Sequence, residues 1–130
     1  MSKNELKLEP GKNILSDIEG ELFDIDAEFE IGRADEFGFM IRGVPVVYNV
    51  KKNELSCGRP KAKLKPIDGK IRLRILVDRV SIEVFANDGR IYMPIRAIPE
   101  GDQKGLEIFT KGGSIKINSL KVHELNSIWK

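Results

Sequence analysis

The sequence has little of the material from which metal centres and disulfides are built. Among its 130 residues there is one cysteine, Cys57, and one histidine, His123. A lone cysteine cannot close an internal disulfide, and these two residues cannot supply the ligand set of a structural zinc site or a haem. The sequence therefore predicts no metal, no cofactor and no disulfide.

An excess of one charge and long apolar runs are lacking as well. Lys and Arg number 22 against 20 Asp and Glu, so the formal net charge at pH 7 is only +2. General nucleic-acid binding rests on many phosphate contacts and a clear basic excess. No apolar run approaches the roughly 20 residues that cross a bilayer, and the first residues lack the apolar region of a secretory signal. We therefore expect neither a nucleic-acid partner nor a membrane partner.

Period-two alternation is what the sequence has in abundance. From Phe23 to Ile31 apolar residues alternate with acidic ones, and from Lys70 to Asp78 they alternate mainly with basic ones. Such alternation is typical of strands that bury one face. If the two strands are neighbours, their outward charges can form cross-strand pairs worth roughly 0.2–1 kcal/mol each; if they are not, the charges simply face water.

A tight hairpin is predicted between the alternating runs Ser81–Ala86 and Arg90–Arg96. The runs are separated by Asn87-Asp88-Gly89. Asp-Gly between two such runs is a strong hairpin signal, because glycine adopts a positive φ without a Cβ clash. Since the link before Ser81 is also short, we expect a three-stranded meander over residues 70–96.

Short apolar stretches predict the other strands, at residues 37–42, 46–50, 54–57, 106–110 and 114–125. In the last stretch the inward phase changes, which indicates a β-bulge near Asn118-Ser119. No window of eleven residues keeps a helical period. The sequence therefore predicts one all-β domain over residues 1–130, an antiparallel β-sandwich of the jelly-roll or concanavalin-like kind with about nine or ten strands and no substantial helix. A closed barrel is the alternative.

The motifs of common catalytic sites do not occur. The chain has no Gly-x-Ser-x-Gly, no Gly-x-x-x-x-Gly-Lys-Ser/Thr and no His-Glu-x-x-His. Asp78, Glu83 and Asp88 bracket the central hairpins, where carboxylates could act on a glycosidic bond, but turn chemistry and an outward strand position explain them. Cys57 is interpreted as a structural residue and His123 as a surface one. We therefore predict no catalytic, cofactor-binding or metal-binding residue.

Four side chains are candidates for carbohydrate or domain contact. Tyr48, Tyr92 and Trp129 each offer an aromatic face that can pair with the apolar C–H face of a sugar ring. Tyr92 is expected to share the outward face of its strand with Arg90 and Arg96, and Arg96 is the fourth candidate. Packing inside the protein is the alternative role for the aromatic residues.

A long motif spans residues 73–89 and reads Leu-Arg-Ile-x-Val-Asp-Arg-x-Ser-x-Glu-Val-Phe-x-Asn-Asp-Gly. It closely resembles the C-terminal module of glycoside hydrolase family 32, which holds invertases, levanases, inulinases and other fructosidases. Supporting similarity covers nearly the whole chain, including Phe37-Gly38-Phe39 and the Gly112-Gly113 turn. The resemblance implies an accessory β-sandwich that packs against an N-terminal five-bladed β-propeller, and the propeller carries the catalysis.

The family's catalytic motifs belong to that propeller. They are an Asn-Asp-Pro-Asn motif, an Arg-Asp-Pro segment and a Glu-Cys motif, and none of them occurs in this sequence. No catalytic residue is therefore carried over, and this chain by itself is expected to be inactive.

Three hypotheses about function remain open. The first is the non-catalytic C-terminal β-sandwich of a fructan- or sucrose-hydrolysing glycosidase, packing on and stabilising the catalytic propeller; it predicts an exposed apolar patch on one sheet. The second is a carbohydrate-binding module that recognises fructan; it predicts a concave, partly polar groove. The third is a self-associating domain whose acidic and basic regions meet in a homodimer, a contact that salt would weaken.

Overall fold

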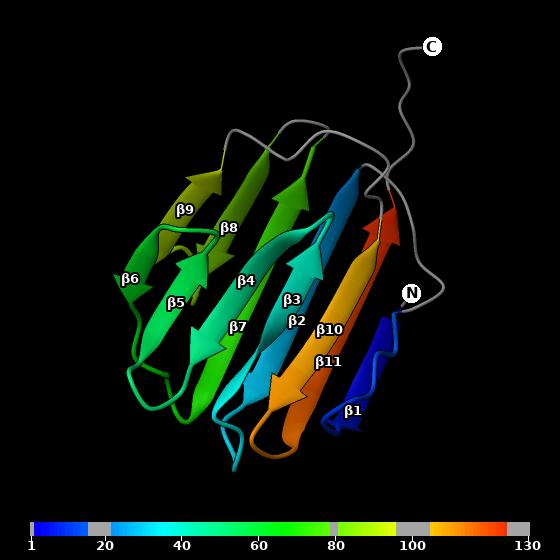
Figure 1. The fold of residues 1–130 in the computed structure, drawn as a ribbon, viewed down its shortest axis with the longest axis vertical. Coiled ribbons are helices and arrows are strands. Elements are labelled where there is room, and N and C mark those ends of the chain that lie inside the picture. The colour runs from blue at the N-terminus through cyan, green and yellow to red at the C-terminus, as the bar shows by residue number, and fades with distance from the viewer. Residues whose placement is uncertain (1, 16–21, 79–80, 96–104, 125–130) are drawn as a thin grey trace.

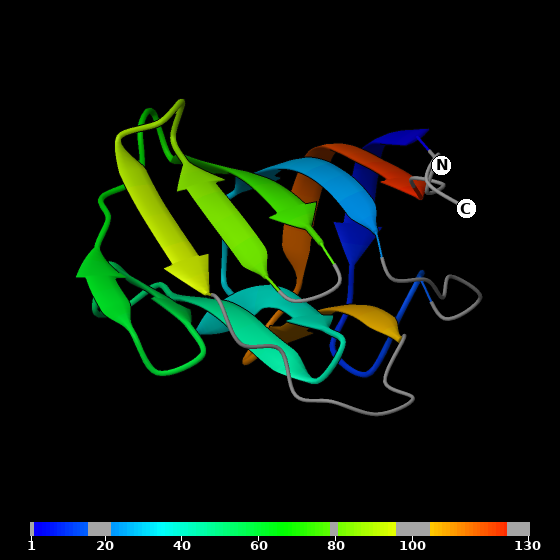
Figure 2. The same cartoon turned by 90° about the horizontal axis from the view of Figure 1, so that it is seen from above.

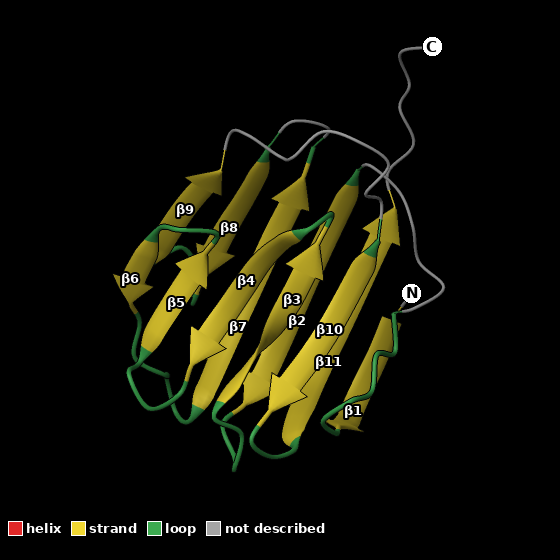
Figure 3. Ribbon diagram, viewed as in Figure 1, coloured by secondary structure: helices red, strands yellow, loops and turns green. Residues whose placement is uncertain are grey.

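The chain folds into two antiparallel sheets that pack face to face. The computed structural model describes residues 2–15, 22–78, 81–95 and 105–124. Within these ranges there are eleven strands and no helix (Figures 1 and 3). Viewed from above, the two sheets form separate layers (Figure 2). The structure confirms the predicted antiparallel β-sandwich over the closed barrel, because the described strands divide into two sheets that are not hydrogen-bonded to each other.

Six strands form the larger sheet, in the order β1-β11-β2-β7-β8-β9. Their bounds are Ser2–Leu8 (β1), Phe23–Glu30 (β2), Lys70–Val77 (β7), Ile82–Ala86 (β8), Ile91–Ile95 (β9) and Ile115–Glu124 (β11). β7, β8 and β9 pair consecutively, which confirms the predicted meander as far as residue 95.

Five strands form the smaller sheet, in the order β10-β3-β4-β5-β6. Their bounds are Glu36–Ile41 (β3), Val44–Asn49 (β4), Glu54–Cys57 (β5), Lys61–Lys63 (β6) and Leu106–Lys111 (β10). β3 to β6 pair in chain order, whereas β10 comes from late in the chain and adds to the other side of β3. Figure 1 shows this sheet in front of the larger one, with the strand axes of the two sheets roughly aligned.

The core lies between the sheets and consists of the inward members of the alternating strands. In β2 the four apolar residues from Phe23 to Phe29 are fully buried, while the acidic residues between them are only half-buried. An aromatic cluster joins the layers, because the ring centroid of Phe29 lies 4.6 Å from that of Phe37 and 5.9 Å from that of Phe39. Tilted and edge-on contacts of this kind add about 0.5–1.5 kcal/mol per pair to the burial itself.

β2 and β7 are direct neighbours, so their outward charges can form the cross-strand pairs that the sequence allowed. All eight residues of β2 pair with the eight of β7, from Phe23 with Val77 to Glu30 with Lys70. The acidic outward face of one strand therefore lies beside the basic outward face of the other. On the other side of β2, the register with β11 shifts between Ile117 and Ser119, where a β-bulge was predicted.

Two strands were not predicted from the sequence, and both lie at sheet edges. β1 pairs only with β11, and its first four residues are all exposed. β6 is three residues long and has two exposed lysines. Only the end of β1, at Leu6 and Leu8, and Ala62 in β6 reach the core, so the alternation is too short to predict either strand, and pairing with a neighbouring strand defines it.

Gly38 lies where the backbones of β3 and β4 approach closely. A Cβ at this position would collide with the carbonyl oxygen of Val46, which belongs to the core of the smaller sheet. We expect Gly38→Ala to lower the free energy of unfolding by about 1–3 kcal/mol, because the two strands must move apart to accept the methyl group. Urea denaturation followed by circular dichroism measures this change.

The matched control for this substitution is Gly105→Ala. A Cβ at Gly105 meets no atom within 4 Å. An equal loss of stability in both variants would contradict the proposed collision.

Candidate functional site

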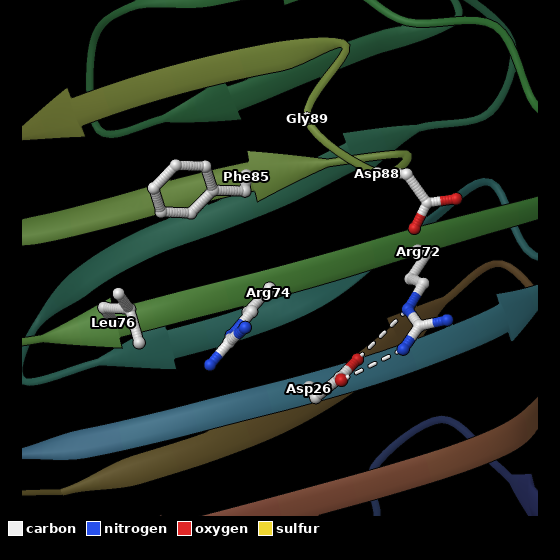
Figure 4. Close-up of a pocket in the computed structure, with 7 residues that line it drawn as sticks. All are labelled: Asp26, Arg72, Arg74, Leu76, Phe85, Asp88 and Gly89. Atoms are coloured by element: carbon white, nitrogen blue, oxygen red, sulfur yellow. Dashed lines mark hydrogen bonds and ion pairs between the residues drawn. The ribbon is translucent and has the colours of Figure 1, made fainter.

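The outer face of the larger sheet carries a hollow of about 450 Å³. It lies over β2, β7 and β8 and the turn that follows β8 (Figure 4). Its charged lining residues are Asp26, Arg72, Arg74 and Asp88, and its apolar ones are Leu76 and Phe85. The hollow therefore combines two carboxylates, two guanidinium groups and an apolar wall.

Strand pairing places part of this lining in one row across the sheet. Asp26 of β2 pairs with Arg74 of β7, Arg74 pairs with Phe85 of β8, and Phe85 pairs with Tyr92 of β9. Directly paired residues point to the same side of an antiparallel sheet, so these four side chains share the outer face. We call these four residues the cross-strand row; it changes from charged to aromatic between β7 and β8.

Each arginine of the hollow is held by an aspartate of β2 through two hydrogen bonds. Arg72 donates from Nε and Nη2 to the two carboxylate oxygens of Asp26, at 3.3 and 3.1 Å. Arg74 donates in the same way to Asp24, at 3.4 and 3.1 Å. These hydrogen bonds first, and then the negative charges of the aspartates, raise the pKa of both guanidinium groups above the ordinary value.

The two ion pairs orient the arginines more than they stabilise the fold. All four side chains are partly exposed, and water and salt screen such pairs. A pair of this kind contributes roughly 0.2–1 kcal/mol. A two-point contact between a planar guanidinium and a carboxylate nevertheless fixes the direction of the remaining N–H groups.

The turn after β8 closes one end of the hollow. Asn87 and Asp88 have φ angles of 48° and 59°, the left-handed conformation expected for this hairpin. The side-chain oxygen of Asn87 accepts a hydrogen bond from the backbone N of Arg72 at 2.9 Å, and its Nδ2 donates to the backbone oxygen of Lys65 at 3.1 Å. Asn87 is buried. Because both ends of its amide are bonded, the turn is fixed with Asp88 near Arg72 (Figure 4).

An aromatic pair borders the hollow. The rings of Phe85 and Tyr92 are stacked, with centroids 5.0 Å apart and planes at 29°. The Tyr92 hydroxyl donates a hydrogen bond to Oε1 of Glu83 at 2.9 Å, and 51% of Tyr92 is exposed. Phe85 is half-buried between Arg74 and Tyr92 in the cross-strand row. The pair thus presents aromatic surface at the hollow without entering the core.

Of the four residues singled out in the sequence, the structure describes Tyr48 and Tyr92, which lie in different sheets. Tyr92 lies on the outer face as expected, beside the hollow. Tyr48 is wrong as a contact residue, because it is fully buried and its hydroxyl donates to the backbone oxygen of Leu64 at 2.7 Å. Burial raises the pKa of Tyr48 to about 12. Arg96 and Trp129 lie outside the described residues.

Sequence reasoning missed the residues that line the hollow. Asp26, Arg72 and Arg74 were identified as outward charges, and Phe85 lay within the family motif, but nothing connected them. The missing information was the neighbour relation of β2, β7 and β8, which strand pairing supplies. Once the order of strands in the sheet is known, the alternation within each strand shows that all four side chains lie on one face.

The other candidates keep the structural roles expected of them. Asp78 directly follows β7, Asp88 lies in the turn after β8, and Glu83 accepts a hydrogen bond from the Tyr92 hydroxyl. Cys57 is fully buried, and burial raises the pKa of its thiol to about 12. His123 is exposed in β11. Over the described ranges, no three His, Cys, Asp or Glu side chains gather into a cation site, and no helix could span a bilayer.

Partly exposed apolar side chains lie on the outer face of the smaller sheet, where Met40, Val47 and Phe109 are half-buried, and the exposed apolar patch of the first hypothesis stays a prediction. Among the large hydrophobic side chains described, only Tyr92 and Ile67, which is 38% exposed, count as exposed. Tyr92 belongs to β9, and Ile67 lies in the turn before β7. The outer face of the larger sheet shows a concave, partly polar feature of the kind that the second hypothesis predicts.

These observations define the chain as an antiparallel β-sandwich with a polar and aromatic hollow on one outer face. The sequence-family model that describes the C-terminal domain of glycosyl hydrolases family 32 matches residues 1–124. The chain therefore belongs to this family of C-terminal domains, as the motif at residues 73–89 indicated.

Two levanases are similar to the chain over nearly all of it. The levanase of Bacillus subtilis (strain 168) is 35% identical over 140 aligned positions, which cover 90% of this chain and 21% of the levanase. The levanase of Bacillus sp. (strain L7) is 34% identical, covering 92% of this chain and 16% of the levanase. The chain thus spans about a fifth of the length of these relatives.

Solved structures share the fold. A fructofuranosidase from Schwanniomyces occidentalis in complex with fructose matches with a TM-score of 0.82 at 19% identity, over 98% of this chain and 33% of that one. An exo-inulinase from Aspergillus awamori matches with a TM-score of 0.77 at 22% identity, over 95% of this chain and 29% of that one. Both confirm the β-sandwich architecture.

The buried Tyr48 phenol predicts a loss of stability at alkaline pH. Its pKa is raised from 10.0 to about 12 in the folded chain, so the unfolded chain releases this proton first. The stabilisation is complete below pH 10 and is lost as the pH rises towards 12. Cys57, with a pKa raised from 9.0 to about 12, acts in the same direction from pH 9 upward.

We expect the free energy of unfolding to fall less steeply between pH 10 and 12 in Tyr48→Phe than in the unsubstituted chain. Urea denaturation at a series of pH values measures both slopes. Identical slopes would mean that the Tyr48 proton does not contribute.

Proposed function

We propose that this chain is the non-catalytic C-terminal β-sandwich of a fructan- or sucrose-hydrolysing glycosidase, and that it packs on and stabilises a catalytic β-propeller. The observation that carries the proposal is the match of residues 1–124 to the C-terminal domain of family 32. The levanases that share this segment are several times longer than the chain. Their remaining length leaves room for a separate catalytic domain.

The contact with that domain is expected to be polar. Interfaces between domains of one chain are commonly more polar than permanent subunit interfaces. The described surface fits this, since the turn between β4 and β5 and the edge strand β6 expose Lys51, Lys52, Lys61 and Lys63, while β2 carries four acidic side chains outward. Contacts between such charges weaken as salt screens them.

Recognition of fructan by the module itself is the second candidate function. It is favoured by the hollow, which is concave and combines charged hydrogen-bonding groups with an aromatic wall that a sugar ring can cover. This role is compatible with docking, because a module with two outer faces can use one for each.

The first prediction from the proposal concerns activity. The purified chain is expected to release no fructose from levan, inulin or sucrose, because the propeller supplies the catalytic groups. Reducing-sugar and fructose assays at high protein concentration measure this, with the complete levanase of Bacillus subtilis as positive control. Fructose release that survives repeated purification would overturn the non-catalytic role.

The second prediction concerns stabilisation. Three forms of the Bacillus subtilis levanase are compared: the complete enzyme, a form that lacks the segment similar to this chain, and a form in which this chain replaces that segment. We expect deletion to lower the melting temperature of the catalytic part, and replacement to restore several degrees of it, since packing adds stabilising contacts. The increase in melting temperature that replacement restores should be smaller at high salt, because salt screens the charged contacts.

An unrelated β-sandwich of similar length, inserted at the same place, controls for the effect of any folded domain. If the replaced enzyme melts no higher than the deleted one, or no higher than this control, the stabilising role is wrong.

A further inference from the structure

The charges in the hollow are balanced. Its lining has two aspartates, Asp26 and Asp88, and two arginines, Arg72 and Arg74, and Arg74 is further paired with Asp24 outside the lining. An anionic ligand would meet guanidinium groups that already pair with Asp26 and Asp24. A cation would meet one carboxylate already bonded to Arg72 and a second, Asp88, whose charge acts on the same guanidinium. The hollow is therefore suited to a ligand without net charge.

The hollow nevertheless keeps directed hydrogen-bonding capacity. A guanidinium group has five N–H donors, and Arg72 uses only its Nε–H and one Nη2–H on Asp26. Each carboxylate oxygen of Asp26 has a second lone pair. Donors and acceptors thus lie side by side, held in place by the two-point ion pair. Adjacent hydroxyl groups of a sugar both donate and accept, so they match this arrangement.

The remaining wall is apolar and flat. Phe85 lines the hollow, and its ring centroid lies 5.0 Å from that of Tyr92, on which it stacks. Leu76 follows Arg74 by two residues in β7 and therefore lies on the same face. The C–H face of a sugar ring can cover such a surface and remove it from water. Because Asp26, Arg74 and Phe85 lie in consecutive places of the cross-strand row, a single ring can contact all three.

We propose that this hollow is a binding subsite for a neutral sugar chain, with fructofuranosyl units as its ligand class. Phe85 supplies the stacking surface, and the Arg72–Asp26 pair together with Arg74 bonds the hydroxyl groups. The hollow's volume of about 450 Å³ lies within the range of small-ligand sites and suits a short segment of such a chain. The proposal rests on the second candidate function and adds to it the site and the ligand class.

Isothermal titration with levan and inulin oligosaccharides tests the proposal. We expect Phe85→Ala to weaken binding at least about tenfold and Arg74→Gln about fivefold, since each removes a central contact. Phe109→Ala and Lys111→Gln are matched controls, because they lie in β10 on the outer face of the opposite sheet. Both controls should stay within about twofold of the unsubstituted chain. Melting temperatures of all variants establish that they are folded.

Ligand charge and salt provide a second readout. Carboxymethylated inulin should bind at least about tenfold more weakly than neutral inulin, because its carboxylates meet an already neutralised hollow. Binding of the neutral oligosaccharides should change little between low and high salt, in contrast to docking of the catalytic domain. Tighter binding of the carboxymethylated form would overturn the proposal.

The outcomes separate the site from the function. If the unsubstituted chain binds fructan but Phe85→Ala and Arg74→Gln bind equally well, the second candidate function stands and the hollow is not its site. If the chain binds no neutral oligosaccharide, both fail. If Phe85→Ala and Arg74→Gln instead abolish the stabilisation of the levanase that carries this chain, the hollow is the docking face for the catalytic domain and the proposal is wrong.

Discussion

The antiparallel pairing of β2 with β7 is the contact on which both faces of the molecule depend. Inward, it places Phe29 beside Ile71 and the other apolar residues of the two strands in the core. Outward, it brings acidic and basic side chains within reach and allows Arg72 to bond Asp26. A slip of one residue would turn every one of these side chains to the opposite face. Burial of the apolar face therefore specifies the register strongly.

Contacts of the backbone as well as of the side chains hold the hollow in shape. Asn87 ties the β8–β9 turn to β7 and to the segment before it, and a buried amide with both ends bonded is costly to disturb. Two-point ion pairs orient the arginines, and stacking on Tyr92 orients Phe85. A surface held in this way loses little conformational freedom on binding, whether a sugar or a protein covers it.

The sequence predicted well wherever alternation was strong, as in β2, β7 and the β8–β9 hairpin, and it located the bulge in β11. It failed for β1 and β6, in which only Leu6, Leu8 and Ala62 reach the core and the alternation is too short to recognise. Tyr48 was taken for a contact residue although it keeps the inward phase of Val46 in β4; that phase was the signal to use. The outward positions of β2 and β7 carry mainly charged residues, and further outward apolar residues, such as Val47 and Phe109, lie on the smaller sheet.

By itself, the sequence determined the strands with a buried face, the tight turn at Asn87–Gly89 and, through the motif at residues 73–89, the family. These are local properties, since alternation and turn chemistry depend on residues close together in the chain. Only the tertiary structure decided that Asp26 and Arg72, 46 residues apart, lie in one hollow with Phe85. The order of strands in a sheet is set by how all inward faces fill one core, and no single strand carries that information.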